Sequence, residues 1–360
     1  GKPAATLLHL GPGLANGWAN LHNARRGHTP VVNIVGDHAL DHKRLDAPLE
    51  SDIESLARAL EGWVRTSTST DDVARDAADA VLAASEPPGR VATLILPADV
   101  SWSEARGPAE PMPAAAPAAP YEARTESVAE ALRDGQPAAL LVGGRVVGSE
   151  AGLVAAARVA AATGARLLCE TFPARLRRGA GLPKVERLGY LAEFTQMQLD
   201  GLRHLVVVDT KAPVSFFAYP DKPGELTPDG CQVHELCDGA VDPIEALNLL
   251  ADHLGAADEV PVADAGRPAA PTGPLTAETM AAALGHLGER DRDPGGLNLL
   301  NGKNGPRTHN VESLLARFQF RLLRRSDLVA RTKRLLSAAT GGDGESEDRH
   351  SDQLCLSVYR

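Results

Sequence analysis

Short apolar runs alternate with longer amphipathic stretches along the first 254 residues of the chain. Each run is rich in Val, Leu or Ile without a polar face, which is typical of strands that are covered on both sides of a sheet. The predicted strands are residues 6–10, 31–35, 91–96, 139–142, 166–169, 205–208 and 232–235. Apolar positions spaced three and four apart predict helices at residues 15–26, 52–62, 71–84, 150–163, 190–202 and 243–254.

Strands that alternate with helices predict parallel sheets with helices on both faces. Two Ala- and Pro-rich segments, residues 103–120 and 255–274, interrupt the alternation and hold few large apolar side chains that could pack a core. The sequence therefore predicts an α/β fold with two doubly wound parallel-sheet domains, residues 1–102 and 121–254. An irregular C-terminal part is expected over residues 275–360.

The chain changes character near residue 286. Residues 286–360 contain 13 Lys and Arg against 10 Asp and Glu, whereas the whole chain has a net charge of −10. One basic amphipathic helix is predicted at residues 311–337, and a polar run follows at residues 341–353. A segment with this pattern and no strand–helix alternation is expected to be partly disordered.

Charge and composition argue against several classes of protein. A net charge of −10 disfavours nucleic acid as the main partner, because phosphate binding needs a basic face. No apolar run approaches the roughly 20 residues of a membrane span, and the first residues lack the layout of a signal peptide. The four cysteines are too few and scattered for a disulfide framework, which predicts a cytoplasmic protein.

Cys231, His234 and Cys237 lie in one short segment and raise the question of a metal site. A tetrahedral site would need a fourth ligand nearby, and the neighbouring sequence offers none. The other interpretation is a strand whose alternate residues face opposite sides. We therefore predict no metal ligands in this chain.

The segment Gly11-Pro12-Gly13-Leu14-Ala15-Asn16 follows the first predicted strand and opens the first helix. Glycine lets backbone approach a ligand closely, and a helix N-terminus offers unpaired N–H groups. Alone, the segment fits a structural turn better than a ligand site. It is followed in order by Pro-Val-Val-Asn-Ile-Val-Gly at residues 30–36, Leu-Glu-Ser-Asp-Ile at 49–53, and Pro-Gly-Arg-Val-Ala-Thr-Leu-Ile-Leu-Pro-Ala-Asp-Val at 88–100.

In this order and spacing the four segments resemble the pyrimidine-binding domain of acetolactate synthases, which depend on thiamine diphosphate (ThDP). That family has a Gly-Pro-Gly-Ala-Thr-Asn turn, a Pro-led strand ending in Gly, a Gln-Glu-Thr-Asp-Ile helix start and a closing strand with Ile-Pro-x-Asp-Val. Residues 138–144 (Ala-Ala-Leu-Leu-Val-Gly-Gly) and 205–209 resemble the central, Rossmann-like domain of the same enzymes. Residues 275–286 resemble the helix that opens their C-terminal domain.

The resemblance implies that the backbone around Pro12 and Gly13, and the side chain of Asn16, lie beside the aminopyrimidine of ThDP. It implies a diphosphate held through Mg²⁺ by a C-terminal domain that carries Gly-Asp-Gly and a later Asn. It makes FAD a candidate cofactor of the central domain, although the double glycine does not complete a dinucleotide-binding motif. It also implies a small 2-oxo acid as substrate and dimers or tetramers of an intact parent.

The sequence departs from the family pattern in three places. We expect the activating glutamate to lie upstream of the segment that matches Gly1. The sole Gly-Asp-Gly, at residues 342–344, has neither a preceding apolar strand nor a following Asn, so we interpret it as chance. Leu49 replaces the family's Gln and removes a polar contact near the substrate. Because the resemblance stops near residue 288, we expect a frameshift, a misplaced gene boundary or a joined fragment there.

Histidine after the second predicted strand offers a partial replacement for the missing glutamate. Asp37-His38 and Asp41-His42 follow the strand that ends at Gly36, where such sheets place ligand groups. His38 is our candidate catalytic residue, as a proton shuttle with an ordinary pKa of about 6.5. The alternative is an exposed polar loop.

Two functional hypotheses follow from the resemblance. The first is a ThDP-dependent carboligase or decarboxylase that transfers a hydroxyethyl unit from pyruvate to a 2-oxo acid, as in branched-chain amino acid biosynthesis. The second is a non-catalytic truncated paralogue that associates with a complete subunit. A third, nucleotide binding by the middle domain alone, rests only on the double glycine. We expect the isolated chain to bind ThDP weakly and not to turn over pyruvate.

Overall fold

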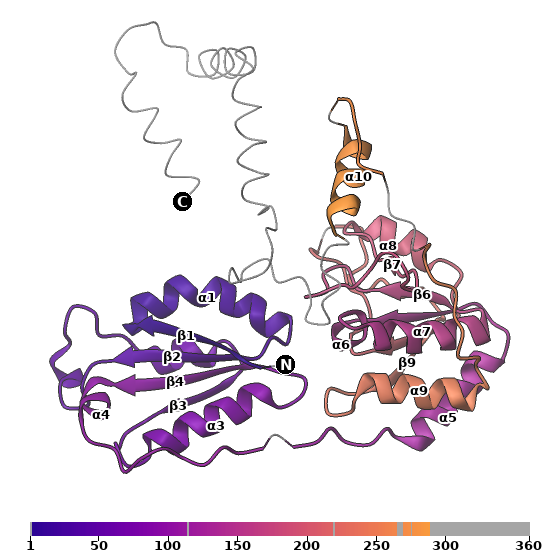
Figure 1. Ribbon diagram of the computed structural model, residues 1–360. Helices are drawn as coiled ribbons and strands as arrows, with labels where there is room; N and C mark the ends of the chain where they lie inside the picture. The colour runs from indigo at the N-terminus through magenta and orange to yellow at the C-terminus, as the bar shows by residue number, and fades with distance from the viewer. Residues whose placement is uncertain (1, 114, 219, 265–268, 275, 289–360) are drawn as a thin grey trace, which may run out of the picture. The chain divides into compact units, whose positions relative to one another are not determined.

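Two parallel β-sheets organise the computed structural model of the chain, which describes residues 2–113, 115–218, 220–264, 269–274 and 276–288 (Figure 1). One sheet is built from strands within the first hundred residues and the other from strands between residues 138 and 237. Each sheet carries helices on both faces. The predicted α/β fold with two parallel-sheet domains is confirmed.

The first sheet has four strands in the order β1-β2-β4-β3, all of them parallel. They are β1 (Ala4–His9), β2 (Val31–Asp37), β3 (Trp63–Thr66) and β4 (Val91–Pro97). Three were predicted within a few residues of their ends. β3 was not predicted, because it is only four residues long and contains polar Arg65 and Thr66, so it lacks a continuous apolar run.

Helices cover both faces of the first sheet (Figure 1). On one face α1 (Leu10–Arg26) and α2 (Ile53–Arg58) pack Leu14 and Ile53 against Val35 and Ile95 of the strands. On the other face α3 (Val73–Ser85) contributes only alanines to the buried cluster, which lets it lie close to the sheet. The short η1 (Lys43–Leu45) and α4 (Ala98–Trp102) follow β2 and β4.

A polar ladder crosses the first sheet through Asn33, which is fully buried in β2. Its amide oxygen accepts the hydroxyl of Thr6 in β1 at 2.8 Å, and its amide nitrogen donates to the hydroxyl of Thr93 in β4 at 3.2 Å. A buried amide is tolerated when its hydrogen bonds are made. The ladder therefore ties the edge strand β1 to the centre of the sheet.

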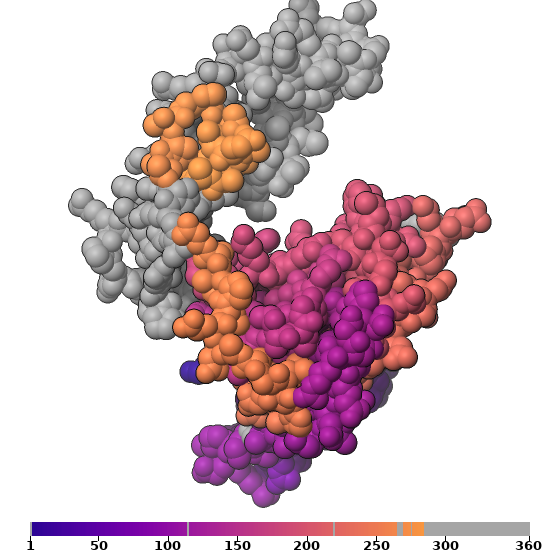
Figure 2. Space-filling view, turned by 90° about the vertical axis from the view of Figure 1, so that its right-hand side faces the viewer, coloured from indigo at the N-terminus to yellow at the C-terminus, as the bar shows by residue number. Residues whose placement is uncertain are grey.

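The second sheet has five parallel strands in the order β7-β6-β5-β8-β9. They are β5 (Ala138–Val142), β6 (Arg166–Cys169), β7 (Glu186–Arg187), β8 (His204–Val208) and β9 (Gln232–Cys237). One face is covered by α5 (Glu122–Arg133), α6 (Gly144–Val147), α7 (Glu150–Thr163) and α9 (Pro243–His253), and the other by α8 (Ala192–Leu199). Helices α5 and α9 pack side by side, as the purple and orange surfaces of Figure 2 show.

The first Ala- and Pro-rich segment is anchored near its end, where Ala118 forms an isolated parallel bridge with Val241 and its N–H donates to Ala240. Further on, α10 (Ala277–Gly288) is helical, in agreement with the family resemblance of residues 275–286. The helix predicted at residues 311–337 and the polar run at 341–353 lie outside the described residues, as does the Gly-Asp-Gly segment.

Candidate functional site

The segments that follow β1 and β2 meet at one edge of the first sheet. In the parallel register His9, the last residue of β1, lies opposite Gly36 of β2. In sheets of this kind ligand groups lie beyond the carboxyl ends of the strands. The glycine segment and His38, which were predicted separately from sequence, therefore leave the sheet at the same edge.

The glycine segment is the first part of α1 and not a separate turn. The helix begins at Leu10, earlier than the predicted start at residue 15, so Pro12 and Gly13 lie in its first turn and Asn16 is exposed on the next. Leu10 has a φ of 57°, which turns the chain sharply from β1 into the helix. Proline is tolerated there because first-turn N–H groups have no acceptor within the helix. Burial of Leu14 secures the early start.

Gly11 lies directly against the segment that precedes α2. A Cβ placed on Gly11 would be 2.3 Å from the Cβ and Oγ atoms of Ser51, closer than any side chain allows. Asp52 then caps α2 by accepting the Ser55 N–H at 3.0 Å, and the hydrogen bonds from Ser55 lower the pKa of Asp52. Residues 49–52 are thereby fixed next to the start of α1.

An ion-pair network joins this segment to the end of β2. The Nζ atom of Lys43 lies 2.8 Å from Oδ2 of Asp37 and 2.7 Å from Oε1 of Glu50. Burial lowers the pKa of Lys43, but its hydrogen bonds with Asp37 and Glu50 outweigh burial and hold that pKa above the usual value. The Asp37 side chain is only 4% exposed, so the pairing also compensates a buried charge. The three groups together carry one negative charge.

Two atoms beside this network lack partners. Among the described residues, three buried side-chain polar atoms make no hydrogen bond, and two of them are His38 Nε2 and Glu50 Oε2. Leaving such an atom unsatisfied costs about 1–3 kcal/mol, so each requires an explanation. His38 is held in place through its backbone, which donates to Asp37 Oδ1 at 2.7 Å. A ligand that supplies a donor and an acceptor at this edge would satisfy both atoms.

The loop between His38 and Lys43 was predicted only in part from the sequence. Asp41 and His42 are exposed, as in the polar-loop interpretation, although the His42 ring lies 5.5 Å from that of His38. Lys43 and Glu50 were not predicted as site residues. The signal for Glu50 was present in the Glu-Ser-Asp segment, but its pairing with Lys43 depends on the path of the loop, which the sequence does not reveal.

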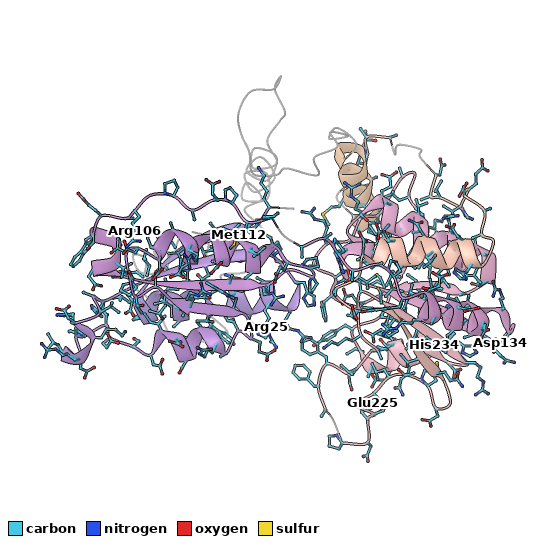
Figure 3. All side chains as sticks on the ribbon, turned by 90° about the horizontal axis from the view of Figure 1, so that it is seen from below. Arg25, Arg106, Met112, Asp134, Glu225 and His234 are labelled. Atoms are coloured by element: carbon cyan, nitrogen blue, oxygen red, sulfur yellow. The ribbon has the colours of Figure 1, made fainter. Side chains whose placement is uncertain are left out.

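His204, a buried histidine of the second sheet, has a structural environment. His204 opens β8 at the amino end of the second sheet, and its ring nitrogens lie 2.8 Å from Asp134 and 3.0 Å from His234. Figure 3 labels Asp134 and His234. Burial, and then repulsion by His204, lower the pKa of His234. This chain of contacts ties β8 and β9 to the end of α5.

Comparisons with known proteins show which proteins this chain resembles. Residues 1–56 match the family described as thiamine pyrophosphate enzyme, N-terminal TPP binding domain. The chain is 54% identical over 289 residues to "Putative acetolactate synthase large subunit IlvX" of Mycobacterium tuberculosis, a match that covers 80% of this chain and 55% of that protein. It is 31% identical over 105 residues, 29% of this chain and 20% of its relative, to benzoylformate decarboxylase of Pseudomonas aeruginosa.

The first 56 residues are thus similar to the N-terminal domain of thiamine-pyrophosphate enzymes, and most of the chain is similar to a putative acetolactate synthase large subunit. The fold of the chain is shared with the solved structure of a "putative thiamin diphosphate-dependent enzyme" from Mycobacterium smegmatis, with a TM-score of 0.58 at 24% identity, over 69% of this chain and 50% of that one. The chain spans about half the length of the relatives that it matches along most of its own length. The family resemblance seen in the sequence is confirmed.

The described residues contain no cluster of three or more His, Cys, Asp or Glu side chains arranged to hold a metal ion, and Cys231 and Cys237 are free thiols. Burial raises the pKa of Cys237 to about 11, which keeps it protonated near neutrality. No helix in this part of the chain combines the length and apolar character of a membrane span.

Proposed function

We propose that this chain supplies the pyrimidine-binding half of a ThDP site, in an enzyme that decarboxylates a 2-oxo acid and ligates the product to a second 2-oxo acid. The observation that carries the proposal is the pair of buried, unpartnered atoms, His38 Nε2 and Glu50 Oε2, at the sheet edge where α1 begins. Similarity to thiamine-pyrophosphate enzymes makes ThDP the ligand to test at this edge.

The local chemistry fits the aminopyrimidine end of the cofactor. The absence of a Cβ at Gly11 lets residues 49–52 approach the helix start, and Gly13 leaves backbone accessible in its first turn. An aminopyrimidine presents both donors and acceptors on its edge, which matches one imidazole nitrogen and one carboxylate oxygen. A site with one net negative charge favours a ligand that gains a proton over one that loses it.

Each residue of the site has a separate role in the proposal. The backbone at Pro12 and Gly13, with the side chain of Asn16, would lie against the ring. His38 Nε2 would pass protons to and from the reacting groups, since an imidazole nitrogen can both accept and donate a proton. Glu50 Oε2 would accept a proton or hydrogen bond from the ring, while Lys43 holds the other carboxylate oxygen in place. When bound, ThDP stabilises the negative charge left on the substrate after CO₂ departs.

The proposal assigns only half of a cofactor site to these residues. The diphosphate and its Mg²⁺ would be held by a C-terminal domain on another subunit, as the family resemblance implies. Pyruvate is the substrate suggested by acetolactate synthase, the relative matched over most of this chain, and an aryl 2-oxo acid is the one suggested by the decarboxylase match. Oligomerisation would be necessary for activity.

A second candidate function is that of a non-catalytic subunit that pairs with a complete one. Leu49 favours it, because the family's Gln is replaced by an apolar side chain that is 44% exposed beside the site. Such a chain would keep the fold and the docking surfaces of the family without contributing to turnover.

Coexpression of the full chain with a complete acetolactate synthase large subunit separates the two functions. We expect the two chains to copurify and expect His38→Gln in this chain to lower acetolactate formation by the mixed oligomer. Equal rates with wild type and H38Q would favour the non-catalytic subunit. The same chain without its partner should form neither acetolactate from pyruvate nor CO₂ from benzoylformate; turnover there would contradict the half-site.

A further inference from the structure

The double glycine of the second sheet lies where α/β folds bind nucleotides. Gly143 and Gly144 follow β5 and open α6 at the carboxyl edge of the sheet. In nucleotide-binding folds the backbone N–H groups of such a turn hold the phosphates, and glycine gives the phosphates room. The turn therefore has part of the sequence of a nucleotide site, and its surroundings decide whether it can act as one.

Every backbone donor from Gly143 to Val146 is already used within the chain. The N–H of Gly144 donates to Glu170 Oε1 at 3.3 Å, and that of Arg145 donates to Asp209 Oδ2 at 2.6 Å. The N–H groups of Gly143 and Val146 donate to backbone oxygens at 3.0 and 3.1 Å. No N–H group of the turn is left for a phosphate.

The space beside the turn is also filled. A Cβ on Gly143 would lie 2.7 Å from Glu170 Oε1, and one on Gly144 would lie 2.4 Å from Asp209 Oδ2. Real side chains do not tolerate such distances from a fixed group. The glycines thus make room for the chain's own carboxylates and not for an external ligand.

The two carboxylates are held firmly in that position. Asp209 accepts two hydrogen bonds from the Arg145 guanidinium at 3.3 Å, besides the bond from the Arg145 backbone. That guanidinium also donates to Val241 O at 3.1 Å, so it is fixed from a second side. Glu170 accepts the Thr210 hydroxyl at 3.3 Å. Displacing either carboxylate would leave half-buried donors without acceptors, at a cost comparable to several hydrogen bonds.

The negative charge around the glycine turn also disfavours phosphate binding there. Burial, and then the negative charge of Asp209, raise the pKa of Glu170, so a further negative charge beside this carboxyl group is unfavourable. Arg145, which contacts Asp209, is committed to that carboxylate. A diphosphate would bring further negative charge without a free partner.

We propose that Asp209 and Glu170 act as built-in anions that close the glycine turn of the second sheet, so that this chain binds neither FAD nor another nucleotide there. The geometry disagrees with the FAD that acetolactate synthases hold in their central domain. The third hypothesis, nucleotide binding by the middle domain alone, is disfavoured for the same reason. This inference does not depend on ThDP binding at the first sheet.

The test uses the purified full chain with FAD and ADP as probes. We expect no flavin absorbance in the purified protein, no saturable quenching of FAD fluorescence and no rise in Tm with either probe. A flavin content near one per chain, or saturable binding of either nucleotide, would overturn the proposal. A ThDP titration on the same sample reports on the first sheet separately, so the two proposals fail independently.

A variant tests the role of the carboxylate itself. Asp209→Asn keeps the shape but removes the charge that Arg145 requires, so we expect a lower Tm that FAD does not restore. Asp200→Asn, at the exposed end of α8, is the matched control and should leave the Tm unchanged. A D209N protein with unaltered Tm would show that Asp209 does not close the turn.

Discussion

Gly11 and Ser51 face each other so closely that a Cβ on the glycine would lie 2.3 Å from the serine side chain. The contact joins the first turn of α1 to the segment that carries Glu50. Both halves of the proposed pyrimidine site therefore depend on one residue without a side chain.

Gly11→Ala should push residues 49–52 away from α1 and weaken ThDP binding at least tenfold, which corresponds to about 1.4 kcal/mol. Gly17→Ala is the control, because its Cβ would meet only the end of the flexible Leu8 side chain at 2.9 Å and alanine favours the helix. Calorimetric titration of both variants checks the prediction. Equal affinities in G11A and G17A would mean that the contact does not shape the site.

Asn33→Ala should destabilise the protein by about 1–3 kcal/mol, because it leaves the hydroxyls of Thr6 and Thr93 without their buried partner. Chemical denaturation measures the change. Asn20→Ala on the exposed face of α1 is the control and should change the free energy of unfolding by less than about 0.5 kcal/mol. An N33A protein as stable as wild type would show that the ladder does not hold β1.

Lys43→Met should leave Asp37 and Glu50 as two unpaired carboxylates at the sheet edge. We expect a loss of about 1–3 kcal/mol near pH 7, less than for a fully buried pair because Lys43 is 35% exposed. The loss should shrink as the pH falls, since protonation of either carboxylate removes the repulsion. A loss that is the same at acid and neutral pH would indicate that Lys43 contributes packing and not charge.

Glu170→Gln should stabilise the protein near neutral pH. A carboxyl group whose pKa is raised on folding stabilises the fold below its ordinary pKa of about 4.3, and this contribution is lost as the pH rises through the raised value. Glutamine can still accept the Gly144 N–H, so the variant removes mainly the charge. Unfolding by urea from about pH 4 to pH 7 should show the gain of E170Q growing with pH. A variant less stable than wild type at neutral pH would contradict the direction of the shift.

Secondary structure was predicted best where the capping and apolar signals in the sequence agree with the observed burial. Helix α7 and strand β6 were predicted to the residue, because Ser149 caps the helix, Gly164 ends it with a φ of 72°, and the strand is apolar. The start of α1 was predicted too late, since Gly-Pro-Gly is typical of a turn. There the buried Leu10 and Leu14 outweigh the low helix propensity of those residues.

The site was predicted only in part for a different reason. Strand ends could be located from sequence, so the glycine segment and His38 were each predicted to follow a strand, and the structure brings them to one edge. The pairing of Lys43 with Glu50, and of Asp209 with Arg145, links residues whose contacts depend on loop paths and not on periodicity. Such side-chain contacts across loops have no signature in a single sequence.

Calorimetric titration of the purified full chain with thiamine and with ThDP plus Mg²⁺ tests the central claim most directly. If the described residues hold only the aminopyrimidine, the two ligands should bind with dissociation constants within about threefold, because the diphosphate finds no partner. Both should lose affinity in the G11A variant. The account would be contradicted if neither ligand bound. It would also be contradicted if ThDP, in the presence of Mg²⁺, bound more than about tenfold more tightly than thiamine.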